Sequence, residues 1–478
     1  MKRTRIIATV GPTCADYKIL KSLISAGVNV CRLNFSFGDH EYHRKNIEKI
    51  RQISSELRRS VAVMLDLQGP KIRIGKLNAP VTLCKGGRVT LSGNSVHKEE
   101  LYLPTTYRNI AADTQTGKTI LLADGRIILT VETVNQARRE VHCRVVAGGA
   151  VLTGKGINLP YTRISMPALT PKDIQDALFG IEQGVDFMAL SFVRSAKDVA
   201  KLKNLIKSKN ADIPVIAKLE KPEALDNLEE ILDVVDGVMV ARGDLADEIS
   251  FEHVPTAQKH IIRRANERGL LSIVATEMLS SMTENPLPSR AEVSDVANAV
   301  LDGTDMIMLS NETASGKYPL KAVQAMSKIA VEAEVMINGD NYRGNWSQSD
   351  QQLEVPQALC LAASFLSHEL NERAMVVLTS SGDTARNLAK CRPDTVIYAA
   401  TYSAKIYRRM AAYHNVYPLL LSNSESAADK KAAIPLELLK QKLLEQKLAR
   451  RGDQLILLAG AAGTNSKWSL NGIQTITV

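Results

Sequence analysis

Short apolar runs alternate with amphipathic segments along much of the chain. Residues 5–10, 28–35 and 61–67 are strand-like runs, and residues 16–26 and 40–57 between them carry apolar side chains at helical spacing. Five further strand-like runs, each with a helix-like segment, follow later in the chain. Eight strands that each have a helical partner are the number found in a (β/α)8 barrel.

Two stretches depart from this alternation. Residues 71–167 contain short β-rich runs punctuated by glycines, which predicts an all-β insertion after the third strand. Residues 338–352 (NGDNYRGNWSQSDQQ) are polar and predict a linker. The domains that we predict are a barrel formed by 1–69 and 168–337, the insertion at 70–167, and a separate α/β domain at 353–478.

Composition narrows the class of protein. The chain of 478 residues has no apolar run near the roughly 18 to 20 residues needed to span a bilayer, so we expect a cytoplasmic protein without a membrane partner. Its six cysteines lack C-x-x-C spacing, which argues against a zinc site or a disulfide framework. The net charge is +9, but basic and acidic residues are interleaved and aromatic residues make up only 4%. We therefore expect small anionic ligands and no nucleic acid.

Candidate chemistry is concentrated in residues 213–246, which read as a strand, a helix and a second strand. Lys218 and Glu220 leave the first strand on the same face, because side chains two apart in a strand point the same way. Asp244 follows the second strand, and strand ends are where such barrels place their chemistry. Two carboxylates beside an ammonium group suit a divalent cation that holds a phosphorylated substrate.

Ordered sequence blocks resemble the pyruvate kinase family over nearly the whole chain. The blocks are 8–12 (ATVGP), 32–36 (RLNFS), 66–73 (DLQGPKIR), 191–194 (SFVR), 217–220 (AKLE), 240–245 (VARGDL), 275–276 (AT), 290–293 (RAEV), 295–298 (DVAN) and 310–314 (SNETA). The resemblance implies an α/β fold class, a TIM barrel with a small β-barrel cap domain inserted after strand 3 and a C-terminal α/β regulatory domain. It also implies transfer of the phosphoryl group of phosphoenolpyruvate to ADP, which gives pyruvate and ATP in the last step of glycolysis.

The resemblance also assigns the central groups of the reaction. Glu220 and Asp244 match the ligands of Mg²⁺, for which Mn²⁺ can substitute. Lys218 matches the group that stabilises the transition state, and Arg32 matches the phosphate-binding arginine.

Further matches concern pyruvate and the nucleotide. The amides of Gly243 and Asp244 are expected to hold the pyruvate carboxylate at a helix start. Thr276 matches the residue on the face where the enolate is protonated, and it would relay the proton through water. The residues assigned to the nucleotide side are Asn34, Ser36, Phe37, Arg73 and Lys155.

The chain departs from the family pattern at the monovalent-cation pocket. The positions that hold K⁺ in many members match Asn34, Ser36, Asp66 and the carbonyl of Leu67. Where many members read D-T-K-G-P-E, this chain reads DLQGPK, so Lys71 brings a covalently attached positive charge to the site. We predict that activity does not require K⁺.

Four other departures leave the catalytic groups intact. Phe37 stands where histidine is usual, so we expect an effect on ADP affinity more than on chemistry. Glu277, Ala246 and Asn311 also replace the usual residues, and the sequence does not reveal their consequences.

Residues 378–384 (LTSSGDT) resemble the effector loop of the family, in which hydroxyls and amides hold an anion. The candidate effector residues are Thr379, Ser380, Ser381, Gly382 and Thr384. Because Asp383 adds a negative charge, we expect a sugar or nucleotide monophosphate, and an ordinary capped turn is the alternative. Allosteric control and a homotetramer are expected from the resemblance alone.

Two other functions stay open at this point. A lyase or aldolase could act on the same Mg²⁺-enolate, although it would need neither the insertion nor a nucleotide site. A catalytically silent homologue is disfavoured because its reacting groups are all present, namely Arg32, Lys218, Glu220, Asp244 and Thr276.

Overall fold

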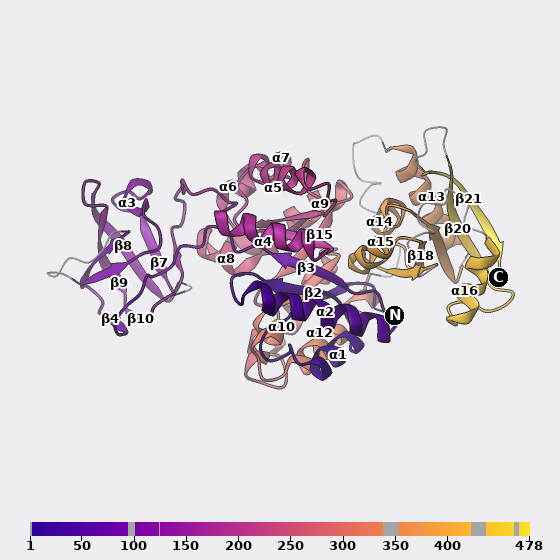
Figure 1. Ribbon diagram of the computed structural model, residues 1–478, viewed down its shortest axis with the longest axis horizontal. Helices are drawn as coiled ribbons and strands as arrows, with labels where there is room; N and C mark the ends of the chain where they lie inside the picture. Colours follow the sequence, from indigo (N-terminus) through magenta and orange to yellow (C-terminus); the bar gives the residue numbers. More distant parts are fainter. Residues whose placement is uncertain are drawn as a thin grey trace.

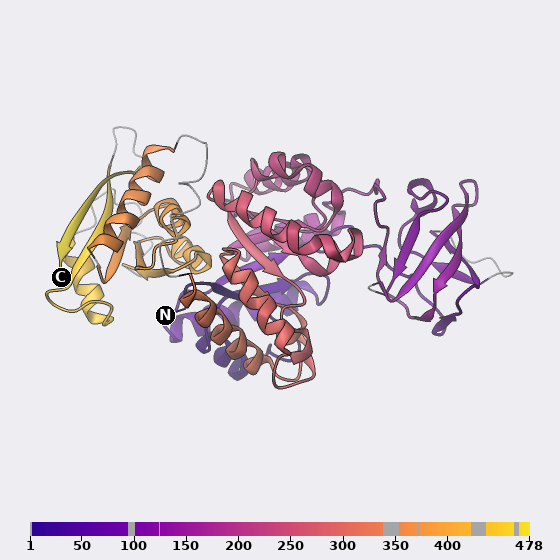
Figure 2. The same cartoon turned by 180° about the vertical axis from the view of Figure 1, so that it is seen from behind.

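Three parts of the protein lie in a row, with a cap of β-strands and one short helix at one end, a barrel in the middle and the C-terminal domain at the other end (Figures 1 and 2). The computed structural model describes residues 2–93, 101–123, 125–337, 353–370, 372–421, 436–462 and 468–478. The predicted linker, 338–352, lies outside the described residues. No helix among the described residues combines the length and the apolar character that a membrane crossing requires.

The middle part is a closed barrel of eight parallel strands, which confirms the predicted fold. Its strands are β1 (Arg5–Thr9), β2 (Val28–Asn34), β3 (Ala62–Asp66), β12 (Phe187–Leu190), β13 (Val215–Leu219), β14 (Gly237–Ala241), β15 (Leu271–Ala275) and β16 (Met306–Leu309). Chain neighbours pair side by side, and β16 closes the barrel on β1.

Helices cover the outside of the barrel (Figure 1). They are α1 (Tyr17–Ser25), α2 (His40–Glu56), α4 (Pro171–Glu182), α5 (Ala196–Ser208), α6 (Pro222–Asp226), α7 (Leu228–Leu232), α8 (Arg242–Glu248), α9 (Val254–Glu267), α10 (Arg290–Leu301), α11 (Asn311–Ala314) and α12 (Pro319–Val335), with 3-10 turns η1 (Phe251–His253) and η2 (Ser280–Thr283). Capping boxes begin two of them, since Thr170 and Asp173 satisfy each other's amides at α4, as do Ser289 and Glu292 at α10.

Side chains along each barrel strand alternate between the interior and the helices. In β13, Ile216 belongs to the interior cluster with Met64, whereas Ala217 and Leu219 belong to the cluster between strands and helices. The same alternation directs Lys218 into the carboxyl-end mouth of the barrel.

The cap is inserted between β3 and α4. It contains β4 (Val81–Leu83), β5 (Arg88–Ser92), β6 (Tyr102–Pro104), α3 (Ile110–Asp113), β7 (Thr119–Leu122), β8 (Ile127–Asn135), β9 (Glu140–Ala147), β10 (Gly149–Val151) and β11 (Ile157–Asn158). Six strands form one sheet in the order β11-β7-β8-β9-β5-β6, and β10 pairs with β4 in a separate two-stranded sheet.

The C-terminal domain is an α/β domain, built from a five-stranded sheet and helices. Its elements are α13 (Val355–Glu369), β17 (Ala374–Leu378), α14 (Asp383–Lys390), β18 (Val396–Thr401), α15 (Ala404–Arg409), η4 (Met410–Ala412), β19 (Val416–Leu420), α16 (Leu436–Glu445), β20 (Gln454–Ala462) and β21 (Trp468–Thr477). The last strand, which the sequence pattern did not predict, runs antiparallel to β20. The domain packs at the amino ends of the barrel strands, where the side chain of Arg5 donates to the carbonyls of Tyr413 and Val416.

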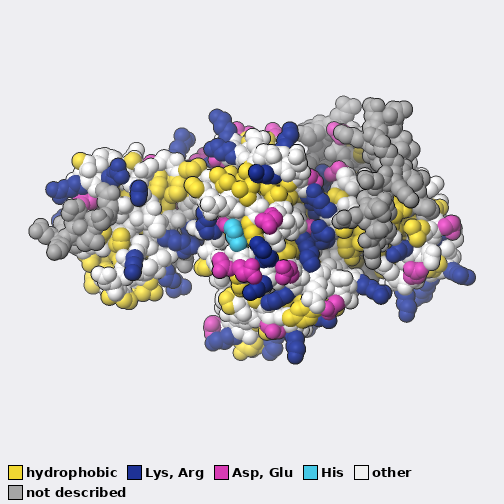
Figure 3. Space-filling model, in the orientation of Figure 1, with side chains coloured by type: hydrophobic (Ala, Val, Ile, Leu, Met, Phe, Trp, Pro, Cys, Tyr) yellow, Lys and Arg dark blue, Asp and Glu magenta, His cyan; other side chains and the backbone are white. Residues whose placement is uncertain are grey.

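Surface charge is mixed on the face shown in Figure 3. Lys and Arg side chains alternate there with Asp and Glu over the barrel and the C-terminal domain. Over the part of the barrel seen in this view, positive side chains are therefore not gathered into one patch.

Candidate active site

Polar side chains converge inside the barrel at the carboxyl ends of its strands. Each of them lies two residues after a side chain that points into the barrel, so it points inward as well. All of them are buried: Thr9, Arg32, Asp66, Ser191 and Lys218. Active sites of TIM barrels lie at this face.

The amine of Lys218 lies at the centre of this cluster. It donates a 2.7 Å hydrogen bond to Ser191 Oγ and lies 2.9 Å from Glu220 Oε1 and 3.4 Å from Asp66 Oδ1. Burial lowers the pKa of Lys218, but the charges of Asp66 and Glu220 outweigh burial and raise this pKa above its ordinary value. The site therefore keeps a fixed positive charge at neutral pH.

Arg32 adds a second cation beside it. Its Nε donates a 2.6 Å hydrogen bond to Asp66 Oδ2, and its Nη1 donates a 3.0 Å bond to Thr9 Oγ1. Burial raises the pKa of Asp66, but Lys218 and Arg32 hold that pKa below its ordinary value. An ammonium and a guanidinium group fixed side by side suit a phosphate group.

Glu220 and Asp244 bring carboxylate oxygens to the same mouth. Glu220 is fully buried, and its Oε2 accepts a 2.7 Å hydrogen bond from the amide of Phe192. Its Oε1 lies 2.9 Å from the amine of Lys218, which is the contact that this oxygen makes. The Oδ1 of Asp244 lies 3.2 Å from the amine of Lys71.

The two carboxylates influence each other. Burial raises the pKa of Glu220, Lys218 lowers it and Asp244 raises it, with a net result above the ordinary value. Two carboxylates close to each other at the mouth of the barrel, one of them fully buried, fit a hard divalent cation. Among the described residues no three His, Cys, Asp or Glu side chains cluster as a metal site. A small hard cation that is held by two carboxylates takes its other ligands from water and substrate.

Thr276 lies at a strained turn beside α8. Thr276 and Glu277 both have positive φ, 68° and 53°, which is uncommon and especially costly for a β-branched residue. The Thr276 hydroxyl accepts a 2.7 Å hydrogen bond from the amide of Gly243 and donates to the carbonyl of Ala275. Arg242 fixes the turn by donating to the carbonyls of Thr276 and Glu277. The structure thus brings Thr276 against the start of α8.

The residues assigned to the nucleotide lie on two parts of the protein. After β2, Asn34 Oδ1 accepts a 3.1 Å hydrogen bond from the amide of Ser36, and Phe37 is 67% exposed. Arg73 and Lys155 belong to the cap, where Lys155 is exposed. Within the described part of the chain no hydrogen bond or ion pair joins these two cap residues to the turn after β2.

Two groups assigned to the K⁺ pocket, Asp66 and the carbonyl of Leu67, already make contacts with other side chains of the protein. The carbonyl of Leu67 accepts a 2.7 Å hydrogen bond from Ser191 Oγ, and Asp66 pairs with Arg32. The ion pair that Lys71 makes is with Asp244, one of the two acids expected to bind the metal.

The candidate effector loop joins β17 to α14. Gly382 has φ of 88°, and its amide donates a 2.9 Å hydrogen bond to Thr379 Oγ1. Ser381 Oγ donates to Asp383 Oδ2, and Asp383 also pairs with Arg386. These local bonds stabilise the turn by themselves, so the alternative of an ordinary capped turn stays open.

Sequence reasoning missed several residues around the site. Ser191 and Thr9 follow the same strand alternation as Lys218, so periodicity alone could have indicated them. Lys221 and Glu248 form a buried 2.6 Å ion pair beside the cluster. The two lie on separate loops and helices, and no local pattern indicates that they meet.

Comparison with known proteins finds one family across the whole chain. The family model "Pyruvate kinase, barrel domain" matches residues 1–323, and "Pyruvate kinase, alpha/beta domain" matches residues 357–470. Pyruvate kinase 2 of Synechocystis sp. is 44% identical over 466 residues, which are 96% of this chain and 76% of that relative. Pyruvate kinases of Staphylococcus aureus and Bacillus licheniformis are 42% and 40% identical, over 89% and 97% of this chain and 73% and 78% of their own lengths.

Proposed function

The chain belongs to the pyruvate kinase family, and from that premise we propose how its residues carry out the reaction. The protein is a phosphotransferase that converts phosphoenolpyruvate and ADP into pyruvate and ATP. The observation that carries the proposal is the protonated amine of Lys218, held among carboxylates beside Arg32 at the carboxyl-end mouth of the barrel.

Glu220 and Asp244 would hold the Mg²⁺ that the family uses, and Mn²⁺ could take its place. When bound, the ion supplies positive charge that binds and polarises phosphoryl and substrate oxygens. The carboxylate of Glu220, buried at the mouth of the barrel with the charge of Asp244 close by, supports this assignment. The Lys71 amine, 3.2 Å from Asp244 Oδ1, would compete with a cation for this carboxylate.

Lys218 and Arg32 stabilise the charge of the moving phosphoryl group. Ser191 and Asp66 aim the Lys218 amine into the mouth, so the stabilising charge needs no reorganisation during the reaction. Arg32, fixed by Asp66 and Thr9, binds the phosphate oxygens through its planar fork.

The start of α8 receives the carboxylate of pyruvate. Amides at this helix start, those of Gly243 and Asp244, can donate to an anion once Gly243 releases the Thr276 hydroxyl. Thr276 then relays a proton through water to the enolate, since its hydroxyl is too weakly acidic to act alone.

The nucleotide binds between the barrel and the cap. Asn34, Ser36 and Phe37, at and after the end of β2, approach it from the barrel, and Arg73 and Lys155 approach it from the cap. Because these groups belong to separate parts of the protein, closure of the cap is what brings them to one ADP and excludes water.

Several finer expectations stay predictions. They are the independence from K⁺, a monophosphate effector at the loop after β17, allosteric control, the homotetramer and the cytoplasmic location. Each rests on sequence resemblance or on the sequence itself.

One assay tests the proposed function. Phosphoenolpyruvate, ADP and Mg²⁺ are supplied, and pyruvate is followed by a coupled hydride-transfer enzyme. We expect pyruvate only when ADP is present. Formation of pyruvate without ADP would indicate a lyase, and no product at all would indicate a silent homologue.

A further inference from the structure

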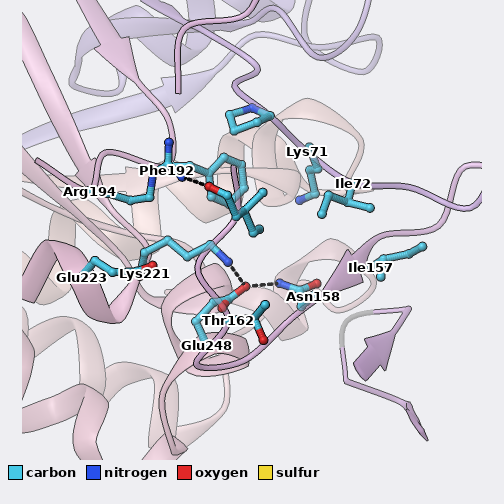
Figure 4. Close-up of a pocket in the computed structure, with 12 residues that line it drawn as sticks. Lys71, Ile72, Ile157, Asn158, Thr162, Phe192, Arg194, Lys221, Glu223 and Glu248 are labelled. Atoms are coloured by element: carbon cyan, nitrogen blue, oxygen red, sulfur yellow. Dashed lines mark hydrogen bonds and ion pairs between the residues drawn. The ribbon is translucent and has the colours of Figure 1, made fainter. Parts of the chain in front are cut away.

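A buried ion pair lies beside the candidate active site, between the barrel and the cap (Figure 4). The amine of Lys221 lies 2.6 Å from Glu248 Oε1, and the two side chains are 5% and 2% exposed. Removing two charges from water is unfavourable, so a pair buried this deeply adds little stability for its own sake. Its position gives it a different task.

Each residue of the ion pair lies on the same segment of chain as one of the proposed metal ligands. Lys221 directly follows Glu220 at the end of β13. Glu248 lies four residues after Asp244 on the same helix, α8, which is about one turn. The ion pair therefore joins the two separate elements that carry the two carboxylates.

Glu220 and Asp244 need such a connection because they repel each other. Both are carboxylates at the same mouth of the barrel, and Glu220 is fully buried, so water screens their like charges only weakly. No side-chain hydrogen bond caps the start of α8 or of α6, so capping does not fix either element.

We propose that Lys221 and Glu248 are a positioning pair that holds Glu220 and Asp244 at the separation that a divalent cation requires. This inference rests on the proposed metal site. Neither partner is a metal ligand; both act through the carboxylates of their neighbours. The side chain of Asn158, in the cap, donates a long 3.5 Å hydrogen bond to the same Glu248 oxygen, so docking of the cap is the competing role.

The test uses the full-length protein and Mn²⁺ as the probe, with no substrate present. In the double variant Lys221→Met/Glu248→Leu the pair is replaced by apolar side chains of similar volume, which keeps a buried site folded. Mn²⁺ binding is titrated by electron paramagnetic resonance, and thermal unfolding checks the fold. We expect a folded protein whose Mn²⁺ affinity is lower by about tenfold or more, the loss typical when a supporting group is removed.

Matched variants separate positioning from other roles. Lys221→Arg keeps the charge and should retain most of the Mn²⁺ affinity. Lys203→Met breaks a 2.8 Å ion pair with Asp236, which precedes β14 at the other end of the barrel, and should leave the affinity unchanged. Asn158→Ala removes only the contact from the cap and should also leave it unchanged.

Two results would overturn the positioning role. One is unchanged Mn²⁺ affinity in the folded double variant. The other is an equal loss in Asn158→Ala, which would assign the pair to cap docking. The proposed metal site fails by a separate result, namely full Mn²⁺ affinity in Glu220→Gln, whatever the double variant shows.

Discussion

The two ends of the barrel both bury a lysine against a carboxylate, yet they treat the lysine in opposite ways. At the carboxyl end Lys218 lies between Asp66 and Glu220. At the amino end Lys390, which comes from the C-terminal domain, shares the single carboxylate of Asp305 with Arg392. Lys218 therefore meets two carboxylates at one end, whereas two cations meet one carboxylate at the other.

The pKa values follow this balance of charges. Burial lowers the pKa of both lysines, but the pKa of Lys218 ends above its ordinary value because Asp66 and Glu220 outweigh burial. Burial lowers the pKa of Lys390 to about 8. The charge of Asp305 raises this pKa only in part, and the positive charge of Arg392 lowers it further. The carboxyl end thus keeps a permanent cation, which the proposed mechanism uses for chemistry, whereas the charges at the amino end join two domains.

Replacement of Lys218 should change activity more than any other substitution that tests the difference between the two ends. We expect Lys218→Met to lower kcat by about 100- to 1,000-fold, the loss that follows removal of one preorganised charge-stabilising donor. The coupled pyruvate assay measures it. Lys21→Met, which breaks an exposed ion pair with Glu56, is the control and should keep normal turnover. Near-normal kcat in Lys218→Met would show that the two ends do not differ in function.

Replacement of Lys390 should affect stability and not chemistry. We expect Lys390→Met to lower the free energy of unfolding by about 3 kcal/mol, because it breaks a buried pair and leaves Asp305 with Arg392 alone. Denaturant unfolding measures the loss, and kcat at a temperature where the variant is folded should stay within threefold. A loss of kcat as large as that of Lys218→Met would contradict a purely structural role.

The pH dependence of stability tests the same interface. Burial raises the pKa of Asp305, but Lys390 and Arg392 bring that pKa below 3.8, its ordinary value. Folding therefore favours the charged form, so its contribution is present above pH 3.8 and is lost as pH falls through the lower folded value. Acid unfolding of the wild type and of Asp305→Asn should show a stability difference that shrinks below pH 3.8. A difference that stays constant or grows there would contradict this sign.

Lys71, which pairs with Asp244, allows a test of the charges at the carboxyl end of the barrel. Because Lys71 supplies a covalently attached cation, we expect turnover in buffer free of Na⁺ and K⁺ to lie within about threefold of turnover with K⁺. Negligible turnover that K⁺ restores would refute this expectation.

The smallest effect is expected at the rim of the site. Phe37→His restores a hydrogen-bond donor at a position that is 67% exposed, and one such bond contributes about 1 kcal/mol. We expect KM for ADP to fall by roughly fivefold or less, with kcat unchanged. A change confined to kcat would place this side chain nearer to the chemistry than the account allows.

The sequence predicted those features that depend on local periodicity. Strand alternation fixed the barrel count and pointed Lys218 into the mouth, because inward positions recur every two residues. The pairing of Lys71 with Asp244 and of Lys221 with Glu248 could not be predicted, since it depends on how separate loops meet. The last strand, β21, was also missed, because the Asn-Gly pair at 471–472 interrupts its β-rich run and is typical of a turn.

A crystal structure with Mn²⁺ and a substrate analogue tests the central claim most directly. The account predicts the ion between Glu220 and Asp244, about 2.0 to 2.3 Å from one oxygen of each, with the Lys71 amine moved away from Asp244. An ion bound at other residues, with the ion pair between Lys71 and Asp244 intact, would contradict it.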